Sequence, residues 1–317
     1  MSNCASSNPH EFGGGSQAAG LDPFRGVDFS ELEKDVMRPR TLTTVLLSAL
    51  VTVMCLLALI PLFSVVWMLL WRGGHKLSVA VLTELPPAPL ETGGGFGNAI
   101  IGTLIMNTLA ALISAPIGIL SAIFLSQAEK DNRFAQAVRF AAKVLTGFPS
   151  VLAGVFAYGT VVLLTGGFSA IAGSIALSIL MLPTILLTTE EAIRMVPRKM
   201  REAAIGMGAT NTQTMWMVLL PTALPGILTG VMLAIARAAG ETAPLLFTAL
   251  FSNYWPIQGA RVELMSPTPS MAVLIYNFAS LPFQNQIELA WAAALVLVVI
   301  VLVTNIIGQS LSRRQIH

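Results

Sequence analysis

Long apolar runs separated by short polar segments make up most of the chain after residue 41. A helix that crosses the hydrocarbon core of a bilayer needs about 20 mostly apolar residues, and six runs reach that length. One of the six, the run at residues 222–248, contains two charged residues, Arg237 and Glu241. Each of the others carries at most one charged residue, at or next to an end. The expected spans are residues 42–70, 99–125, 143–164, 168–188, 222–248 and 287–309.

The segments between these runs differ in character. Residues 1–40 are polar and lack the apolar core of a signal peptide, so we expect a mostly disordered tail with a short amphipathic helix at 29–37. Thr165-Gly166-Gly167 predicts a tight hairpin between the third and fourth spans. The apolar stretch 271–278 is too short to cross a membrane, and we expect an interfacial or re-entrant helix there.

The distribution of Lys and Arg predicts the orientation, because cytoplasmic loops of membrane proteins carry an excess of cations. Fourteen of the eighteen lie in the amino tail, the second loop, the fourth loop and the carboxyl end. Three lie in the other loops, and Arg237 lies within a span. Both termini are therefore expected in the cytoplasm, which requires an even number of spans.

Composition agrees with an all-α integral membrane protein. Hydrophobic residues make up 55% of the chain and charged residues 11%, and the mean hydropathy is +0.75, whereas soluble domains carry about a quarter charged residues. Cys4 and Cys55 are far apart and suggest neither a disulfide nor a metal site. No G-x-x-x-x-G-K-[ST] sequence occurs, so we expect no nucleotide site, no catalytic residues and no cofactor in this chain.

The fourth loop, residues 189–221, predicts a helix, a sharp turn and a second helix. Pro197 suits the start of a helix, Gly208 suits a left-handed position after its end, and Thr210 or Asn211 can cap the next helix. Such a protruding turn fits a docking site for another protein. A solvated connector is an equally good interpretation of the pattern alone.

The same loop resembles the EAA motif of ABC importer permeases, EAA-x3-G-x9-I-x-L-P, with Val218 in place of Ile. In that family the turn is a coupling helix that inserts into a cytoplasmic ATPase subunit, so the resemblance implies that ATP and Mg are bound by a separate protein. The residues that carry the motif, and the proposed coupling role, are Glu202, Ala203, Ala204, Gly208 and Pro221.

A second resemblance covers residues 42–312 and leaves the tail 1–40 outside. Over this region the chain is similar to the permease subunits of phosphate ABC importers, and to the PstA family more than to its sister family PstC. The strongest segment is 236–245, which reads Ala-Arg-Ala-Ala-Gly-Glu-Thr-Ala-Pro-Leu. Further matches are Ile101-Gly102-Thr103-Leu104, Met106-Asn107-Thr108, Ala115-Pro116-Ile117-Gly118 and Gly147-Phe148-Pro149-Ser150-Val151.

Arg237 and Glu241 are the candidate residues of a substrate pathway. A charge near the middle of a span costs about 2.5–3.5 kcal/mol, and Glu241 at i+4 can form an ion pair with it. One interpretation is a structural pair that locks helices together. The other, which the resemblance favours, makes the Arg237 guanidinium a ligand for an oxyanion, because it can donate two parallel hydrogen bonds to phosphate. A stripe of small residues on the same face is expected to pack against another helix, and consists of Ala223, Gly226, Gly230 and Ala234.

The combined prediction is a six-span permease with the type I ABC importer fold, residing in the plasma (inner) membrane of a bacterium or archaeon. The resemblance implies that it imports inorganic phosphate together with a second, PstC-like permease, two PstB-like ATPase subunits and an outer, PstS-like phosphate-binding protein. No nucleic acid is expected as a partner. The alternatives are a permease for another oxyanion such as sulfate or molybdate, a secondary anion transporter that does not use ATP, and a non-transporting scaffold.

Overall fold

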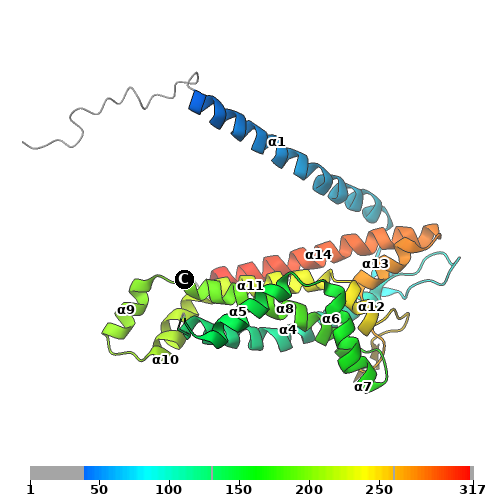
Figure 1. Cartoon of the computed structure of the whole chain (residues 1–317). Helices are drawn as coiled ribbons and strands as arrows, with labels where there is room; N and C mark the ends of the chain where they lie inside the picture. The colour runs from blue at the N-terminus through cyan, green and yellow to red at the C-terminus, as the bar shows by residue number, and fades with distance from the viewer. Residues whose placement is uncertain (1–38, 130, 260, 315–317) are drawn as a thin grey trace, which may run out of the picture. The chain divides into compact units, whose positions relative to one another are not determined.

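The computed structural model describes residues 39–129, 131–259 and 261–314, so most of the predicted tail and its 29–37 helix lie outside the described residues. The described part is almost wholly helical (Figure 1). It divides into two compact units, one ending at Leu62 and one running from Phe63 onward. The elements are α1 (Pro39–Met68), η2 (Leu69–Gly73), α2 (Gly74–Lys76), α3 (Val79–Thr83), α4 (Gly97–Gln127), α5 (Arg133–Thr146), α6 (Ser150–Ala157), η3 (Tyr158–Val162), α7 (Leu163–Thr165), α8 (Ala170–Arg194), α9 (Arg198–Gly206), α10 (Asn211–Thr214), η4 (Met215–Leu219), α11 (Leu220–Ala239), α12 (Ala243–Thr248), β1 (Ile257–Gln258), β2 (Arg261–Val262), α13 (Met271–Ser280) and α14 (Gln284–Arg314).

The first unit consists, in its described part, of the amino-terminal portion of α1. This portion is apolar on all sides, with Pro61 inside the helix, which is the composition of a helix surrounded by lipid. The continuous helical stretch that begins here, Leu42–Lys76, is long enough to cross a membrane.

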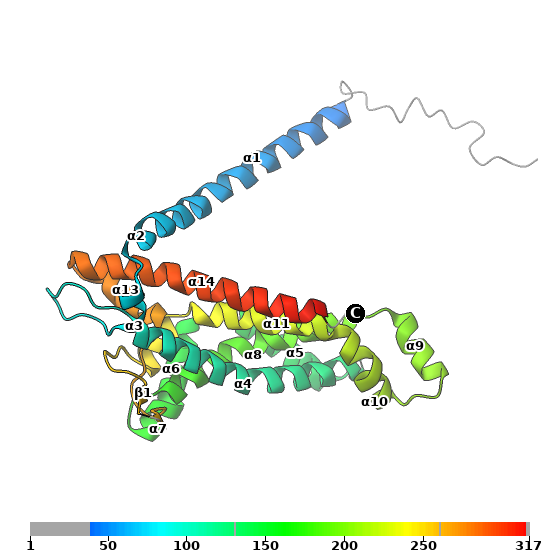
Figure 2. The same cartoon turned by 180° about the vertical axis from the view of Figure 1, so that it is seen from behind.

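Four long helices of the second unit, α4, α8, α11 and α14, lie lengthwise beside one another in both views (Figures 1 and 2). Helix α8 is the central one, because it packs against both α4 and α11. The core between these helices includes the fully buried side chains of Met106, Leu177, Met181 and Ile185. At Gly230 of α11 an added Cβ would lie 2.1 Å from Thr188 Oγ1 of α8, so the predicted small-residue stripe does bring two helices into close contact.

The third predicted span, 143–164, is not one straight helix. Helix α5 begins much earlier, at Arg133, and ends at Thr146, and the axis then turns by 106° into Ser150–Thr165. Pro149 explains the break, because proline cannot donate its backbone N–H and restricts the residue before it. Within the described residues, five helices are long and apolar enough to cross a membrane, or six if this bent pair counts as one span.

The fifth predicted span, 222–248, is also corrected. One continuous helical stretch runs from Asn211 to Ala239 and is interrupted at Gly240, before the short helix α12. Arg237 therefore lies in the last turn of α11, not near the middle of a span.

The two ends of the second unit carry different segments (Figures 1 and 2). At one end the loop after α8 forms α9 and α10, while α12, α13 and the β1–β2 hairpin lie toward the other. Helix α13 confirms the expected short apolar helix, but its side chains are buried against protein. The hydroxyl of Thr103 on α4 accepts the Met271 N–H at 2.9 Å and holds the start of α13 against the bundle.

Candidate functional site

Arg237 presents its guanidinium at the end of α11. The side chain is 44% exposed, and no hydrogen bond joins it to another described side chain or carbonyl. The positive charge is placed favourably, because the carbonyl groups at a helix C-terminus carry a partial negative charge. The hydrogen-bond donors of the guanidinium are thus available to a ligand.

Glu241 lies two residues after the end of α11 and is less exposed, at 17% of its side chain. Arg237 Nε and Glu241 Oε1 are 3.8 Å apart, which is beyond the usual length of an N–H···O hydrogen bond. The two charges compensate each other without a bond between them. The predicted pair therefore exists, but it is held loosely.

The turn beside this pair is itself well fixed. Glu241 donates its backbone N–H to the Ala238 carbonyl at 3.1 Å, and the Pro244 that follows lies against α6, where a Cβ at Gly154 would come within 2.6 Å of Pro244 Cα. The backbone holds the two side chains in one place, and only the side chains are free to exchange partners.

The predicted EAA turn forms as expected. Helix α9 ends at Gly206, and Gly208 adopts a left-handed conformation with φ +89°. Thr210 then caps α10 through a capping box with Gln213, in which Thr210 Oγ1 accepts the Gln213 N–H at 3.2 Å and Gln213 Oε1 accepts the Thr210 N–H at 2.9 Å. The two helices of the turn therefore have a defined relative geometry.

The surface of this turn is suited to a protein contact. Glu202 and Ala203 are exposed, whereas Ala204 is buried and faces the turn itself. Met195 is 68% exposed and Met207 84% exposed, and flexible methionine side chains adapt well to a binding surface.

Pro221 lies at the start of α11, directly after the π-helical turn η4. A proline inside a helical run cannot bond to the carbonyl one turn earlier, and π-helical turns are a common accommodation of such an interruption. The stretch from Asn211 to Ala239 remains helical throughout and spans roughly 40 Å at 1.5 Å per residue. One helix thus links the EAA turn to Arg237.

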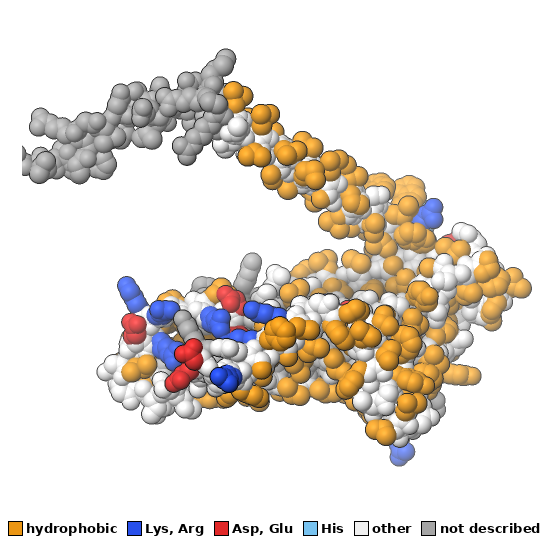
Figure 3. Space-filling view, in the orientation of Figure 1, with side chains coloured by type: hydrophobic (Ala, Val, Ile, Leu, Met, Phe, Trp, Pro, Cys, Tyr) orange, Lys and Arg blue, Asp and Glu red, His pale blue; other side chains and the backbone are white. Residues whose placement is uncertain are grey.

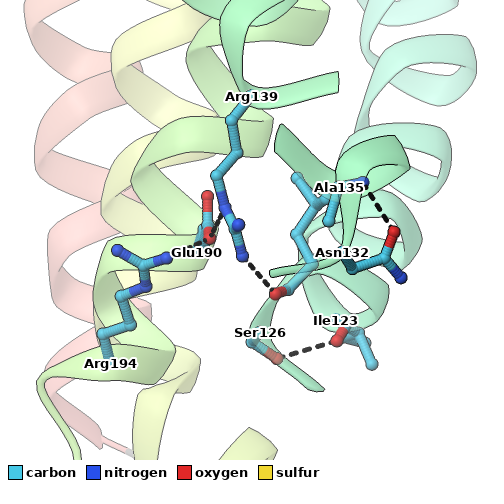
Figure 4. A network of polar contacts seen from close by, with 8 residues as sticks. Ile123, Ser126, Asn132, Ala135, Arg139, Glu190 and Arg194 are labelled. Atoms are coloured by element: carbon cyan, nitrogen blue, oxygen red, sulfur yellow. Dashed lines mark hydrogen bonds and ion pairs between the residues drawn. The ribbon is translucent and has the colours of Figure 1, made fainter. Parts of the chain in front are cut away.

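An ion-pair network that the sequence did not predict surrounds the buried Glu190 at the end of α8 (Figure 4). Glu190 is 5% exposed, and its Oε1 accepts hydrogen bonds from Arg139 Nε and from Arg194 Nη2, both at 2.7 Å. Arg139 Nη2 also donates to the Leu125 carbonyl at 2.6 Å, near the end of α4. The i,i+4 spacing of Glu190 and Arg194 could have indicated their ion pair from the sequence. Arg139 lies 51 residues before Glu190, so no local pattern indicated its part in the network.

Polar residues inside the predicted spans are candidates for contacts between helices, and include Asn107, Tyr158, Asn305 and Gln309. The buried Asn107 Oδ1 has no hydrogen-bond partner among the described residues and lines a largely apolar cavity of about 450 Å³ between α4, α11 and α14. Tyr158 packs against Phe168 with ring centroids 6.3 Å apart. In the described part of the chain, His, Cys, Asp and Glu form no cluster of three or more that could hold a metal ion.

Comparisons with known proteins agree with the family resemblance and with the fold. Residues 114–317 match the family model described as the binding-protein-dependent transport system inner membrane component. The chain is 37% identical over 262 residues to the phosphate transport system permease protein PstA of Yersinia pestis, covering 82% of this chain and 87% of that protein. It is 38% identical to PstA of Xylella fastidiosa strain Temecula1 over 271 residues, covering 84% and 92%.

Among solved structures, the fold is similar to a chain of a bacterial alginate ABC transporter that was crystallised with an alginate pentasaccharide-bound periplasmic protein. The TM-score is 0.60 over 88% of this chain and 98% of that one, at 16% sequence identity. This likeness concerns the fold alone.

Proposed function

The chain belongs to the family of binding-protein-dependent transport system inner membrane components, and from this membership we propose that it carries inorganic phosphate across the inner membrane as a PstA-type permease. It is a multi-pass membrane subunit of an ABC importer and not itself an enzyme. The phosphate assignment follows its PstA relatives, which extend over more than four fifths of the chain.

One observation carries the mechanism. The EAA turn and a guanidinium without hydrogen bonds to described residues lie at the two ends of one continuous helix, Asn211–Ala239. A displacement of α9 by a bound ATPase can therefore be transmitted along this helix to Arg237. Closely packed protein interiors transmit such displacements well, because they are scarcely compressible.

At the far end, Arg237 acts as a transient ligand of the substrate. Its planar guanidinium can donate two parallel hydrogen bonds to a phosphate oxyanion. Glu241 compensates the charge of Arg237 when no anion is present, and at 3.8 Å it leaves the hydrogen-bond donors free. Glu241 can also accept a hydrogen bond from a protonated phosphate, which fully ionised sulfate cannot donate.

Family membership places this chain with an ATPase and a substrate-binding protein. The complete assembly in our proposal has a PstC-like second permease, two PstB-like ATPase subunits and an outer PstS-like phosphate-binding protein. Glu202, Ala203 and Gly208 form the ATPase contact, and the buried Ala204 supports the turn from within. Pro221 lies inside the transmitting helix, at the start of α11. ATP and Mg are held by the ATPase subunits.

The test is phosphate uptake by vesicles that contain this chain with its candidate partners. We expect uptake that requires ATP, with sulfate as the control anion. Equal uptake of sulfate or molybdate would assign the chain to another oxyanion, and uptake that continues after ATP depletion would favour a secondary transporter.

A further inference from the structure

A cavity of about 440 Å³ lies beneath α9, at the junction of α4, α5, α8 and η4. Four arginines line it, and no Asp or Glu is among the described residues of its wall. This end of the second unit is also where most of the charged side chains visible in Figure 3 gather. The four are Arg139, Arg194, Arg198 and Arg201.

The charges around this cavity are not balanced. Arg139 and Arg194 share a single carboxylate, that of Glu190 (Figure 4). Arg198 and Arg201 form no ion pair with any residue that the structure describes. Four positive charges thus face one compensating negative charge around a space large enough for an anion and several water molecules, each of which takes about 30 Å³.

The start of α9 adds further uncompensated positive charge beside the cavity. The positive end of a helix dipole favours anions, yet the first turn of α9 contains no acidic residue and instead carries Arg198, Lys199 and Arg201. The N-cap position is Pro197, which supplies no side-chain acceptor for the first amide groups. An oxyanion in the cavity would compensate the arginines and the helix end together.

We propose that this cavity is a second anion site that binds phosphate-class oxyanions on the side of the membrane that carries the EAA turn. Arg198 and Arg201 contribute from α9, and Arg139 and Arg194 contribute from the helices beneath it. The bound anion bridges α9 to the bundle and stabilises the coupling segment. The choice of phosphate rests on the proposed function, whereas the existence of an anion site does not.

The test is hydrogen exchange of the α9 amides, residues 198–206, in the assembled importer in phosphatidylcholine nanodiscs. Adding inorganic phosphate at ten times its dissociation constant should slow this exchange by up to about tenfold. The double variant Arg198→Gln, Arg201→Gln should lose the effect. Lys199→Gln, which removes a charge from the same turn outside the cavity wall, should keep it.

Two further arms identify the ion and separate this site from the transport pathway. Sulfate acting as well as phosphate would support a general oxyanion site, and an effect from phosphatidylglycerol without free phosphate would identify a lipid headgroup as the source. Arg237→Gln should keep the protection of α9 even though it stops transport. If Arg237→Gln transports normally while α9 still responds through Arg198 and Arg201, the proposed pathway fails and this site stands.

The proposal is overturned if neither phosphate, sulfate nor the acidic lipid protects α9 in the unmodified protein. It is equally overturned if the double variant responds like the unmodified chain. Loss of the response in Lys199→Gln as well would show that only the overall charge of the turn matters, not the cavity.

Discussion

Arg237 Nε and Glu241 Oε1 lie 3.8 Å apart across the end of α11, close enough to compensate each other and too far apart to share a hydrogen bond. The largely buried pair at the other end of the unit, Arg139 and Glu190, is bonded at 2.7 Å. A pair that locks helices together would be expected to be hydrogen-bonded, as Arg139 and Glu190 are. The longer separation of Arg237 and Glu241 favours an arginine that exchanges partners.

Substitutions of Arg237 test its role as an oxyanion ligand. Arg237→Gln should abolish phosphate uptake while the importer still assembles. Arg237→Lys should reduce uptake at least about tenfold, because ammonium keeps the charge but lacks the planar two-bond geometry. Uptake is measured in vesicles with expression matched to the unmodified chain.

The control is the double variant Arg237→Gln, Glu241→Gln. It removes both charges and leaves neither uncompensated, so a purely structural pair would be rescued. Near-normal uptake in this variant would show that Arg237 is a scaffold residue and that the site assignment is wrong.

Gly208→Val tests the EAA turn. A Cβ added at position 208 would meet no atom within 4 Å, so the expected penalty comes mainly from the backbone at φ +89° and amounts to about 1 kcal/mol or more. We expect weaker association with the ATPase and slower uptake, measured by co-purification and transport. Gly206→Val is the matched control, since it has the same open surroundings and a helical backbone; equal behaviour of the two variants would exclude the turn geometry as the cause.

Glu190→Gln should destabilise the second unit. The change leaves Arg139, which is 19% exposed, without a charged partner in a largely buried place, and breaking such a pair costs about 3 kcal/mol. Thermal unfolding in detergent measures the loss. Glu191→Gln, at the exposed neighbouring position, should change stability by no more than about 0.5 kcal/mol, and a similar loss in both variants would contradict the assigned role of the network.

The expected orientation is tested with single cysteines in a chain from which Cys4 and Cys55 have been replaced. Asp131 and Thr212 are exposed positions beside the caps of α5 and α10, so substitution there leaves both caps intact. Membrane-impermeant thiol reagents should reach these two from the cytoplasmic side, and a cysteine at Met265, which is 64% exposed, from the outside. Labelling of position 131 from outside intact cells would show that the orientation is the opposite of the one expected.

The sequence by itself determined the membrane class, the approximate spans and the EAA turn. These features depend on local properties, because twenty apolar residues cross a bilayer wherever they stand and a turn at φ +89° requires glycine in most contexts. For the same reason the left-handed Gly208 and a cap at Thr210 or Asn211 were predictable, and the structure has the cap at Thr210.

Only the tertiary structure decided where helices end and which distant charges meet. The break at Pro149 and the end of α11 at Ala239 fall inside apolar runs that hydropathy alone cannot divide. Arg139 and Glu190 are brought together by the packing of α5 against α8. Their contact depends on where whole helices lie. The packing of side chains throughout the bundle sets these positions, and no short segment of the sequence specifies that packing.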